Sequence, residues 1–246
     1  MNTELIALVP AAGIGSRALR SGQTASLPKQ YQLLNGEPML RHAVRALLAD
    51  PRIAQVRVVV AANDPWADAA LQGLARCVVR SCGGPSRAHT VLAGLLDAAL
   101  PADAWVLVHD AARPGLPRQA LNRLVSACLG HPVGGLLAMP VPDTVKRQQP
   151  PGLVSAEPRA SAFAQVQGTI DRTGLWLAQT PQMFRAGALC AALQQAGPDH
   201  PMLTDEASAM ELAGYHPLLV PGSARNFKVT WPDDFELMQH WLALPG

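Results

Sequence analysis

Two cations near the start of the chain, Arg17 and Lys29, flank a segment rich in small and hydroxyl-bearing residues. They come after Pro10-Ala11-Ala12-Gly13-Ile14-Gly15, which directly follows an apolar run that predicts a strand over 5–9. Small residues after a strand let a phosphate approach backbone N–H groups closely. A guanidinium and an ammonium beside such a loop suit a polyanion such as a nucleoside triphosphate. The alternative is a tight turn with two solvated charges.

A second set of polar side chains, His109-Asp110-Ala111-Ala112-Arg113-Pro114, follows the strand predicted over 104–108. The carboxyl ends of strands line the ligand crevice in open α/β sheets. Asp110 is therefore a candidate ligand for a metal ion or a hydroxyl group, and Arg113 for a phosphate. The alternative is an Asp–Arg pair that braces the loop. We expect His109 to be structural rather than a base.

A third candidate is Lys228, a lone cation in the otherwise apolar, strand-like segment 226–230. A lysine in such a segment either reaches an anion or extends to the surface. The sequence leaves both open.

The opening loop also contains Gly13-x-Gly15-x-x-Ala18, which fits a loose dinucleotide-binding fingerprint. That fingerprint needs a helix to begin inside the glycines, whereas residues 21–28 are poor helix formers. A P-loop also fails, because no Gly-Lys-Ser/Thr follows. What remains is an extended phosphate-wrapping loop.

The elements that would position these residues alternate along the chain. Helices are predicted at 38–49, 64–74, 86–100 and 117–129, and further strands at 56–62, 77–80, 104–108 and 133–141. This alternation predicts an α/β fold with a wound, mostly parallel sheet and helices on both faces.

The alternation breaks at 142–173, where short strands at 144–147 and 165–170 could pair as an arm. Long irregular intervals inside compact domains are usually functional or protruding. Regular structure then returns, with a strand at 178–183, a helix at 185–195, a helix start at 204–206, a strand at 218–220 and a closing helix at 233–244. We predict one domain over 1–246 with an inserted arm at about 142–175.

The composition excludes several classes of protein. Of 246 residues, 49% are hydrophobic and 15% charged, with a net charge of +2, which gives no basic footprint for nucleic-acid binding. The four cysteines lack C-x-x-C spacing, so they are predicted to be buried apolar residues rather than zinc ligands or disulfides. No stretch approaches about 18 apolar residues, and no signal peptide is recognisable, so we expect a cytoplasmic protein without membrane contact.

Ten blocks of sequence, taken together, resemble one family. They are PAAGIGSR (10–17), PKQY (28–31), GGPSR (83–87), VLAGL (91–95), VHDAARP (108–114), DTVKR (143–147), DRTGLW (171–176), TPQMF (180–184), TDEASAME (204–211) and NFKVT (226–230). Their order is similar to that in the 2-C-methyl-D-erythritol 4-phosphate cytidylyltransferases of the non-mevalonate isoprenoid pathway.

The resemblance implies a Rossmann-like nucleotidyltransferase fold with a protruding β-arm that builds a homodimer. It implies a reaction of CTP with methylerythritol 4-phosphate, giving 4-diphosphocytidyl-2-C-methyl-D-erythritol and pyrophosphate, with Mg²⁺ or another divalent cation. The longer segment between Arg17 and Lys29, the pair His89-Thr90, Pro85 and an insertion in the arm depart from the family pattern.

The resemblance also implies roles for individual residues. Catalytic residues would be Arg17, Lys29 and Lys228. Nucleotide-binding residues would be Ala11, Ala12, Gly13, Gly15, Gly83, Gly84, Arg87, Thr90 and Asp110. Residues for the second substrate would be Asp110, Arg113, Thr144, Arg172, Thr180 and Thr204, with Thr144 and Arg172 supplied by the arm of the neighbouring subunit. Asp110 would also be the candidate metal ligand.

Three alternatives stay open. A cytidylyltransferase for another polyol phosphate, such as ribitol 5-phosphate, would share the loop and the cations. An NAD(P)-binding oxidoreductase would rest on the Gly13-x-Gly15 match. A non-catalytic nucleotide-binding module is the third.

Overall fold

The structure of the chain is a computed structural model that describes residues 5–13, 27–150 and 163–244. The chain divides into two compact units, of which the larger contains Met1–Ala138 and Ala178–Gly246 and the smaller contains Met139–Leu177. The smaller unit overlaps the arm predicted at about 142–175, whose role in dimer formation stays a prediction.

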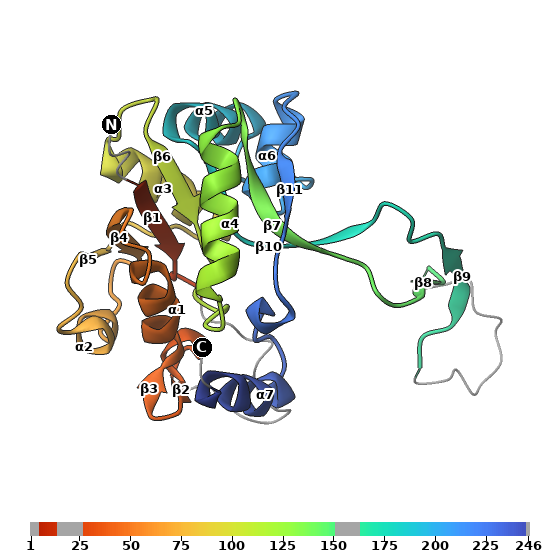
Figure 1. Cartoon of the computed structure of the whole chain (residues 1–246), viewed down its shortest axis with the longest axis horizontal. Coiled ribbons are helices and arrows are strands. Elements are labelled where there is room, and N and C mark those ends of the chain that lie inside the picture. The colour runs from red at the N-terminus through yellow and green to blue at the C-terminus, as the bar shows by residue number, and fades with distance from the viewer. Residues whose placement is uncertain (1–4, 14–26, 151–162, 245–246) are drawn as a thin grey trace. The chain divides into compact units, whose positions relative to one another are not determined.

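A seven-stranded mixed sheet runs through the larger unit, within the described residues (Figure 1). Its strands are β1 (Leu5–Pro10), β4 (Ile53–Val59), β5 (Cys77–Arg80), β6 (Trp105–Val108), β7 (Gly134–Pro140), β10 (Trp176–Arg185) and β11 (Leu218–Pro221). Their order is β11-β7-β10-β6-β1-β4-β5. β1 is parallel to both β4 and β6, while β10 runs antiparallel to β6. The predicted α/β class with a mostly parallel sheet is confirmed.

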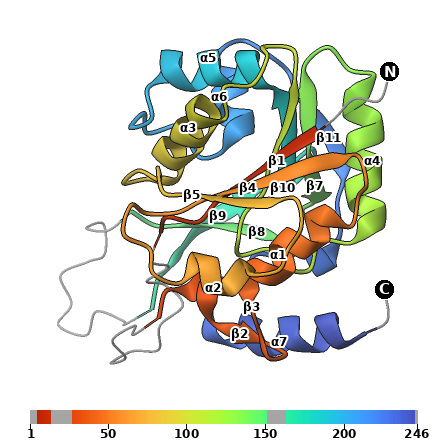
Figure 2. The ribbon, with the colours of Figure 1, turned by 90° about the vertical axis from the view of Figure 1, so that its left-hand side faces the viewer.

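Helices cover both faces of this sheet (Figure 2). They are α1 (Met39–Leu48), α2 (Ala67–Leu71), α3 (Arg87–Ala98), α4 (Arg118–Leu129), α5 (Ala186–Ala196), α6 (Glu206–Leu212) and α7 (Pro232–Ala243). Ala7 and Val9 of β1 pack in one cluster with α1, α2 and α4, and Leu8 packs in another with α3, α5 and α6. Successive side chains of a strand point to opposite faces, so β1 is apolar throughout because both faces are buried.

A smaller apolar cluster lies beneath the segments that carry the candidate site. It joins α7 to the hairpin of β2 (Leu33–Leu34) and β3 (Glu37–Pro38). Ala112 and Val229 are both buried in it. Because Ala112 follows Asp110 closely and Val229 adjoins Lys228, this cluster fixes the backbone on which the two charged residues stand.

Several predictions for individual elements were wrong. Residues 226–230 do not form a strand in the described structure: Ala224–Asn226 is a short 3-10 helix, and Val229 N–H donates to the Ala112 carbonyl (2.8 Å). The helix predicted from 64 begins at Ala67, although Asp64 accepts from its first N–H groups as a cap would. Pro38 precedes α1 instead of starting it, and β4 begins three residues before the predicted start.

The smaller unit contains an antiparallel pair, β8 (Val145–Gln148) and β9 (Val166–Ile170). Val145 lies opposite Ile170, and Lys146 Nζ donates to Thr169 Oγ1 (2.7 Å). The predicted pairing of these two segments is confirmed.

Two further observations concern the predicted sequence features. No helix in the described ranges is long and apolar enough to cross a membrane. The four cysteines are free thiols, and Cys128 is buried while the other three are half-buried.

Candidate functional site

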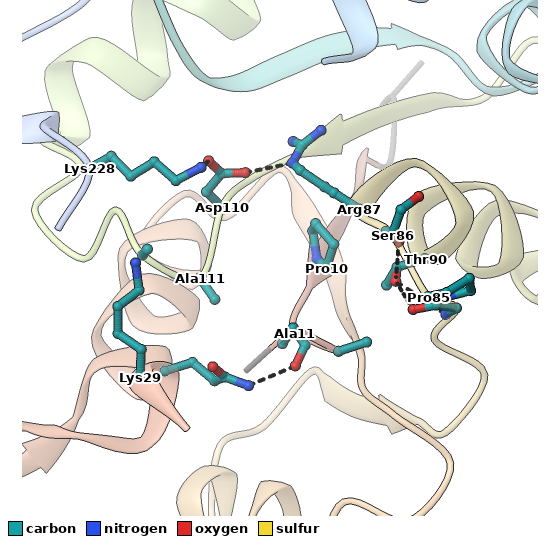
Figure 3. Close-up of a pocket in the computed structure, with 15 residues that line it drawn as sticks. Pro10, Ala11, Lys29, Pro85, Ser86, Arg87, Thr90, Asp110, Ala111 and Lys228 are labelled. Atoms are coloured by element: carbon teal, nitrogen blue, oxygen red, sulfur yellow. Dashed lines mark hydrogen bonds and ion pairs between the residues drawn. The ribbon is translucent and has the colours of Figure 1, made fainter. Parts of the chain in front are cut away.

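A cavity opens where the carboxyl ends of β1 and β6 meet (Figure 3). It encloses about 700 Å³ including its open mouth, which is the size range of small-molecule sites. Its lining residues are Pro10, Ala11, Ala12, Gly13, Lys29, Gln30, Gly84, Pro85, Ser86, Arg87, Thr90, Asp110, Ala111, Ala112 and Lys228. The chain has three lysines in all, and two of them line this cavity. The structure therefore brings the loop after β1 together with Lys29, Asp110 and Lys228, as the sequence predicts.

Asp110 is the charged residue at the centre of the cavity wall. Its Oδ1 accepts from Arg87 Nε (2.9 Å) and its Oδ2 lies 2.8 Å from Lys228 Nζ. Arg113 Nε lies 3.8 Å from Oδ2. Burial alone would raise the pKa of this carboxyl, but the three cations outweigh it and hold the pKa of Asp110 well below its usual range. Asp110 is therefore an ionised acceptor.

The backbone around Asp110 is fixed by Thr180 and His109. Asp110 N–H donates to Thr180 Oγ1 (2.9 Å), and that hydroxyl lies 3.0 Å from His109 Nδ1. His109 Nε2 lies 3.0 Å from the Arg113 carbonyl, which only accepts, so Nε2 carries the hydrogen and Nδ1 accepts from Thr180. Burial lowers the pKa of His109 to about 4, which keeps the ring neutral at pH 7.

This arrangement bears on the roles predicted for the same residues. The Thr180 side chain is buried and its hydroxyl is engaged on both sides, so Thr180 positions Asp110. Its predicted contact with a substrate stays a prediction. His109 fills the structural role that the sequence suggests.

Arg113 is tied to the backbone of neighbouring segments. Its guanidinium donates to the Asn226 carbonyl (2.7 Å) and to the Ala178 carbonyl (3.3 Å). Burial lowers its pKa, and Asp110 opposes that shift. These contacts match the alternative in which an Asp–Arg pair braces the loop, and a phosphate contact for Arg113 stays a prediction.

Lys29 lines the cavity from the short 3-10 helix Lys29–Tyr31. Its Nζ donates to the Val229 carbonyl (2.6 Å), and Gln30 Nε2 donates to the Ala11 carbonyl (2.9 Å). Tyr31 donates to Asp64 Oδ2 (2.6 Å); burial and this carboxylate together raise the pKa of Tyr31, which stays protonated. Three side chains in a row thus anchor the turn to three different segments.

The third wall is the start of α3. Ser86 caps the helix by accepting from His89 N–H (3.3 Å), as predicted. Thr90 is buried and donates its hydroxyl to the Ser86 carbonyl (2.9 Å), so its predicted contact with a nucleotide stays a prediction.

The glycines of this wall differ in what they do. A Cβ on Gly83 would lie 2.5 Å from Ala12 Cβ and 2.7 Å from the Val60 carbonyl oxygen, so Gly83 allows close packing behind the cavity. Gly84 lines the cavity, and a Cβ on Gly13 would meet open space.

Arg87 lines the cavity and also binds Glu206, an acid that the sequence does not single out. Its Nη1 and Nη2 donate to Glu206 Oε1 (2.6 Å) and Oε2 (3.0 Å). Burial opposes the charge on Arg87, but Glu206 and Asp110 outweigh it and raise the pKa of the guanidinium. Burial raises the pKa of Glu206, and Arg87 opposes that shift.

Comparison with known proteins identifies the family. A family model described as 2-C-methyl-D-erythritol 4-phosphate cytidylyltransferase (IspD) matches residues 5–243. The chain belongs to this family. It is therefore a cytidylyltransferase, and the family is the one that the ten blocks of sequence indicate.

Individual members of the cytidylyltransferase family agree over the whole length. The 2-C-methyl-D-erythritol 4-phosphate cytidylyltransferase of Bordetella pertussis is 61% identical over 242 residues, which are 98% of this chain and 100% of the relative. A crystal structure of a 4-diphosphocytidyl-2C-methyl-D-erythritol synthase superposes with a TM-score of 0.80 at 36% identity, covering 98% of this chain and 99% of the other. The Francisella tularensis cytidylyltransferase structure gives 0.76 at 30% identity, covering 97% and 99%.

Among the described residues, three further predicted ones do not line this cavity. Thr204 lines a neighbouring cavity that shares Ser86 and Arg87. Thr144 and Arg172 belong to the smaller unit, where both are exposed and Arg172 donates to the Pro142 carbonyl. Gly15 and Arg17 lie outside the described residues.

Sequence reasoning missed Glu206 and Gln30. Glu206 directly follows the helix cap Asp205, where an acid is ordinary because it favours the helix N-terminus. Its partner Arg87 is 119 positions away. Gln30 had a signal, since a polar residue between Lys29 and the buried Tyr31 must find a partner if it is buried.

Proposed function

We propose that the chain transfers a cytidylyl group from CTP to 2-C-methyl-D-erythritol 4-phosphate, giving 4-diphosphocytidyl-2-C-methyl-D-erythritol and pyrophosphate. The observation that carries the proposal is the cavity of a cytidylyltransferase-family chain that is lined by Lys29, Arg87 and Lys228, the last two of which bind its single ionised carboxylate, Asp110. Such a wall suits a triphosphate and a sugar phosphate together.

The chemistry needs no general base. The second pKa of a phosphate monoester is about 6, so the attacking phosphate is largely ionised at neutral pH. Its oxygen forms a bond to the α-phosphorus of CTP while the bond from that phosphorus to the bridging oxygen of pyrophosphate breaks. The titratable groups at this site agree with that route: His109 is buried and neutral, Tyr31 stays protonated, and Asp110 is held by cations.

The barrier therefore comes from bringing one anion up to another and from the charge at the α-phosphorus. Fixed cations lower it by positioning and electrostatic stabilisation. Lys228 lines the cavity and has three N–H donors, of which its contact with Asp110 uses one. Lys29 lines the same cavity, and Arg17 completes the set that we propose as catalytic.

Asp110 could supply one protein ligand to a divalent cation. Mg²⁺ in nucleotide-dependent enzymes is usually held by one or two carboxylates together with substrate phosphates. Within the described residues, no group of three or more His, Cys, Asp or Glu side chains is arranged for a metal, and Asp110 is the carboxylate of the cavity lining. Mg²⁺ would then be bound largely by phosphate oxygens, with Asp110 as its protein ligand, and would neutralise charge on the triphosphate.

We also propose that the chain forms a homodimer through the smaller unit. Two-stranded hairpins are marginally stable alone. The smaller unit exposes large apolar side chains, with Val166 on β9 59% exposed and Leu177 on β10 54% exposed. A second copy would cover them, and Thr144 and Arg172 would then serve the partner's substrate.

The test is pyrophosphate release from CTP with a panel of polyol phosphates. We expect release with methylerythritol 4-phosphate and little with ribitol 5-phosphate. Lys29→Ala should lower turnover by about 10²- to 10³-fold, the range for removing one preorganised donor, while circular dichroism and Tm stay close to wild type. Arg118→Ala, which removes an exposed cation outside this cavity, is the matched control.

Three results would contradict the proposal. Normal turnover in Lys29→Ala would contradict the catalytic role proposed for Lys29. A preference for ribitol 5-phosphate would show that methylerythritol 4-phosphate is not the second substrate. A thermal shift with NADPH and none with CTP would favour an oxidoreductase.

A further inference from the structure

Glu206, the first residue of α6, is a buried acid that lies behind the cavity instead of in it. Its side chain is 1% exposed, and both carboxylate oxygens bind the Arg87 guanidinium at 2.6 and 3.0 Å. A bidentate contact of this kind fixes the plane and the direction of the guanidinium as well as its charge.

Glu206 is itself held firmly by its neighbours. Asp205 caps α6 by accepting from Ser208 N–H (2.9 Å), which sets the first turn of the helix. Gln182, on β10, accepts from Ala207 N–H (2.7 Å) and donates to Asp205 Oδ2 (2.8 Å). The carboxylate of Glu206 thus projects from a turn that is bonded to the central sheet.

With two nitrogens held by Glu206, Arg87 directs its third donor, Nε–H, at Asp110 Oδ1 (2.9 Å). Asp110 in turn holds Lys228 Nζ at 2.8 Å. The four groups form a row of alternating charge, and Figure 3 shows the last three of them. Because each group sets the direction of the next, the geometry at Lys228 depends on Glu206.

We propose that Glu206 is a positioning residue for cytidylyl transfer. By fixing Arg87 it sets the orientation of the Asp110 carboxylate, and through it the position of Lys228 beside the α-phosphate. This inference rests on the proposed function, since it assumes that Asp110 and Lys228 face the nucleotide.

The charge balance gives the proposal a distinctive kinetic signature. Replacing Glu206 by a neutral residue leaves one more uncompensated positive charge behind the cavity, which favours an anionic nucleotide. The same change frees Arg87 to turn, so Asp110 and Lys228 lose their alignment. Positioning therefore predicts a lower kcat with a KM for CTP that does not rise. A purely packing role would lower stability and leave the kcat of the folded protein unchanged.

The experiment is steady-state kinetics of Glu206→Gln with CTP and methylerythritol 4-phosphate. We expect kcat to fall about 10- to 100-fold, the loss typical of removing a partner that orients a functional group, with KM for CTP unchanged or lower. Glu206→Asp keeps the charge but is one methylene shorter, so it should recover part of the lost kcat. Glu211→Gln makes the same chemical change at an exposed position of the same helix and should match wild type.

Wild-type kcat in folded Glu206→Gln, or a raised KM with kcat unchanged, would overturn the proposal. If Glu206→Gln does not fold, Glu206→Asp decides it, because wild-type kcat in that variant excludes positioning. Lys29→Ala and Lys228→Ala in the same assay separate the two proposals. Wild-type turnover in both overturns the proposed function, whereas their loss beside a normal Glu206→Gln overturns positioning alone.

Discussion

Two aspartates of this chain, Asp110 and Asp97, each lie between cations, and they differ in what surrounds those cations. Asp97 contacts Arg57 Nη2 and Arg80 Nη2, both at 2.5 Å; the Arg57 side chain is 14% exposed and the Arg80 side chain 47%. Asp110 contacts Arg87 and Lys228, and Arg87 is bound again by Glu206. The Asp97 cluster thus ends at a half-exposed arginine, whereas the Asp110 cluster extends to a buried carboxylate.

The comparison shows that similar ion pairs contribute differently according to what they hold. Exposed pairs contribute about 0–1 kcal/mol, because water and salt screen them. A buried pair contributes little net stability, but removal of one partner leaves a charge without compensation and costs about 3–5 kcal/mol. We infer that the Asp97 cluster, one of whose cations is half-exposed, contributes little, whereas the Asp110 cluster sets the geometry of the cavity.

The largest effect on stability should come from Asp110→Asn. The variant leaves Arg87, Lys228 and Arg113 facing one another without their shared anion. We expect the free energy of unfolding to fall by about 3 kcal/mol, at the lower end of the range for buried pairs because two of the cations reach solvent. Urea denaturation at pH 7 measures it. If the free energy of unfolding fell by less than about 1 kcal/mol, the Asp110 cluster would contribute no more than the Asp97 cluster, and the proposed difference between them would be wrong.

A second effect, of about the same size but confined to acid pH, should come from His109, which has no counterpart beside Asp97. Burial lowers its pKa from 6.5 to about 4, so between these values the unfolded chain binds a proton that the folded chain does not. Its contribution is complete above pH 6.5 and is lost as pH falls toward 4, about 3 kcal/mol in total.

The measurement is the free energy of unfolding across pH 4–7 for wild type and His109→Gln. The difference between the two curves should shrink as the pH falls, because only wild type loses this contribution. Asp110 is present in both proteins, so its contribution, which starts to be lost below about pH 5 because its folded-state pKa lies well below the usual range, cancels in the difference. Parallel curves would show that the pKa of His109 is not lowered in the fold.

The smallest effect should come from Asp97→Asn. We expect the free energy of unfolding to change by less than about 1 kcal/mol, and the change to vanish in 1 M NaCl, where the Debye length is about 3 Å. Urea denaturation at low and high salt checks both points. A larger change that persists in salt would mean that the two clusters do not differ in kind.

Much of the fold could be predicted from local sequence. Apolar β-branched runs such as Cys77–Arg80 became strands, and Ser86 caps α3 as its position suggests. The failure at 226–230 is instructive, because an apolar pattern predicts a strand only when a neighbouring strand is available. Here Val229 packs beneath Ala112 in a separate apolar cluster instead of joining the sheet.

The site was predictable in its cations and less so in its supports. Lys29 and Lys228 stand out because each is a lone ammonium among small or apolar residues. Glu206 and Gln182 do not stand out in the sequence, because the role of each depends on partners that are distant in the chain. Local periodicity carries no information about contacts of that kind.

The hydrogen bond from Lys29 to the Val229 carbonyl joins residues 200 positions apart, and this sets an order of events in time. Ribosomes add about 5–20 residues per second, so the two partners emerge about 10–40 s apart. During that interval Lys29 has been synthesised, but the Val229 carbonyl that accepts its hydrogen bond has not. The cavity is thus one of the last features to be completed in synthesis, because a chain that stops before Lys228 lacks both that lysine and the acceptor of Lys29.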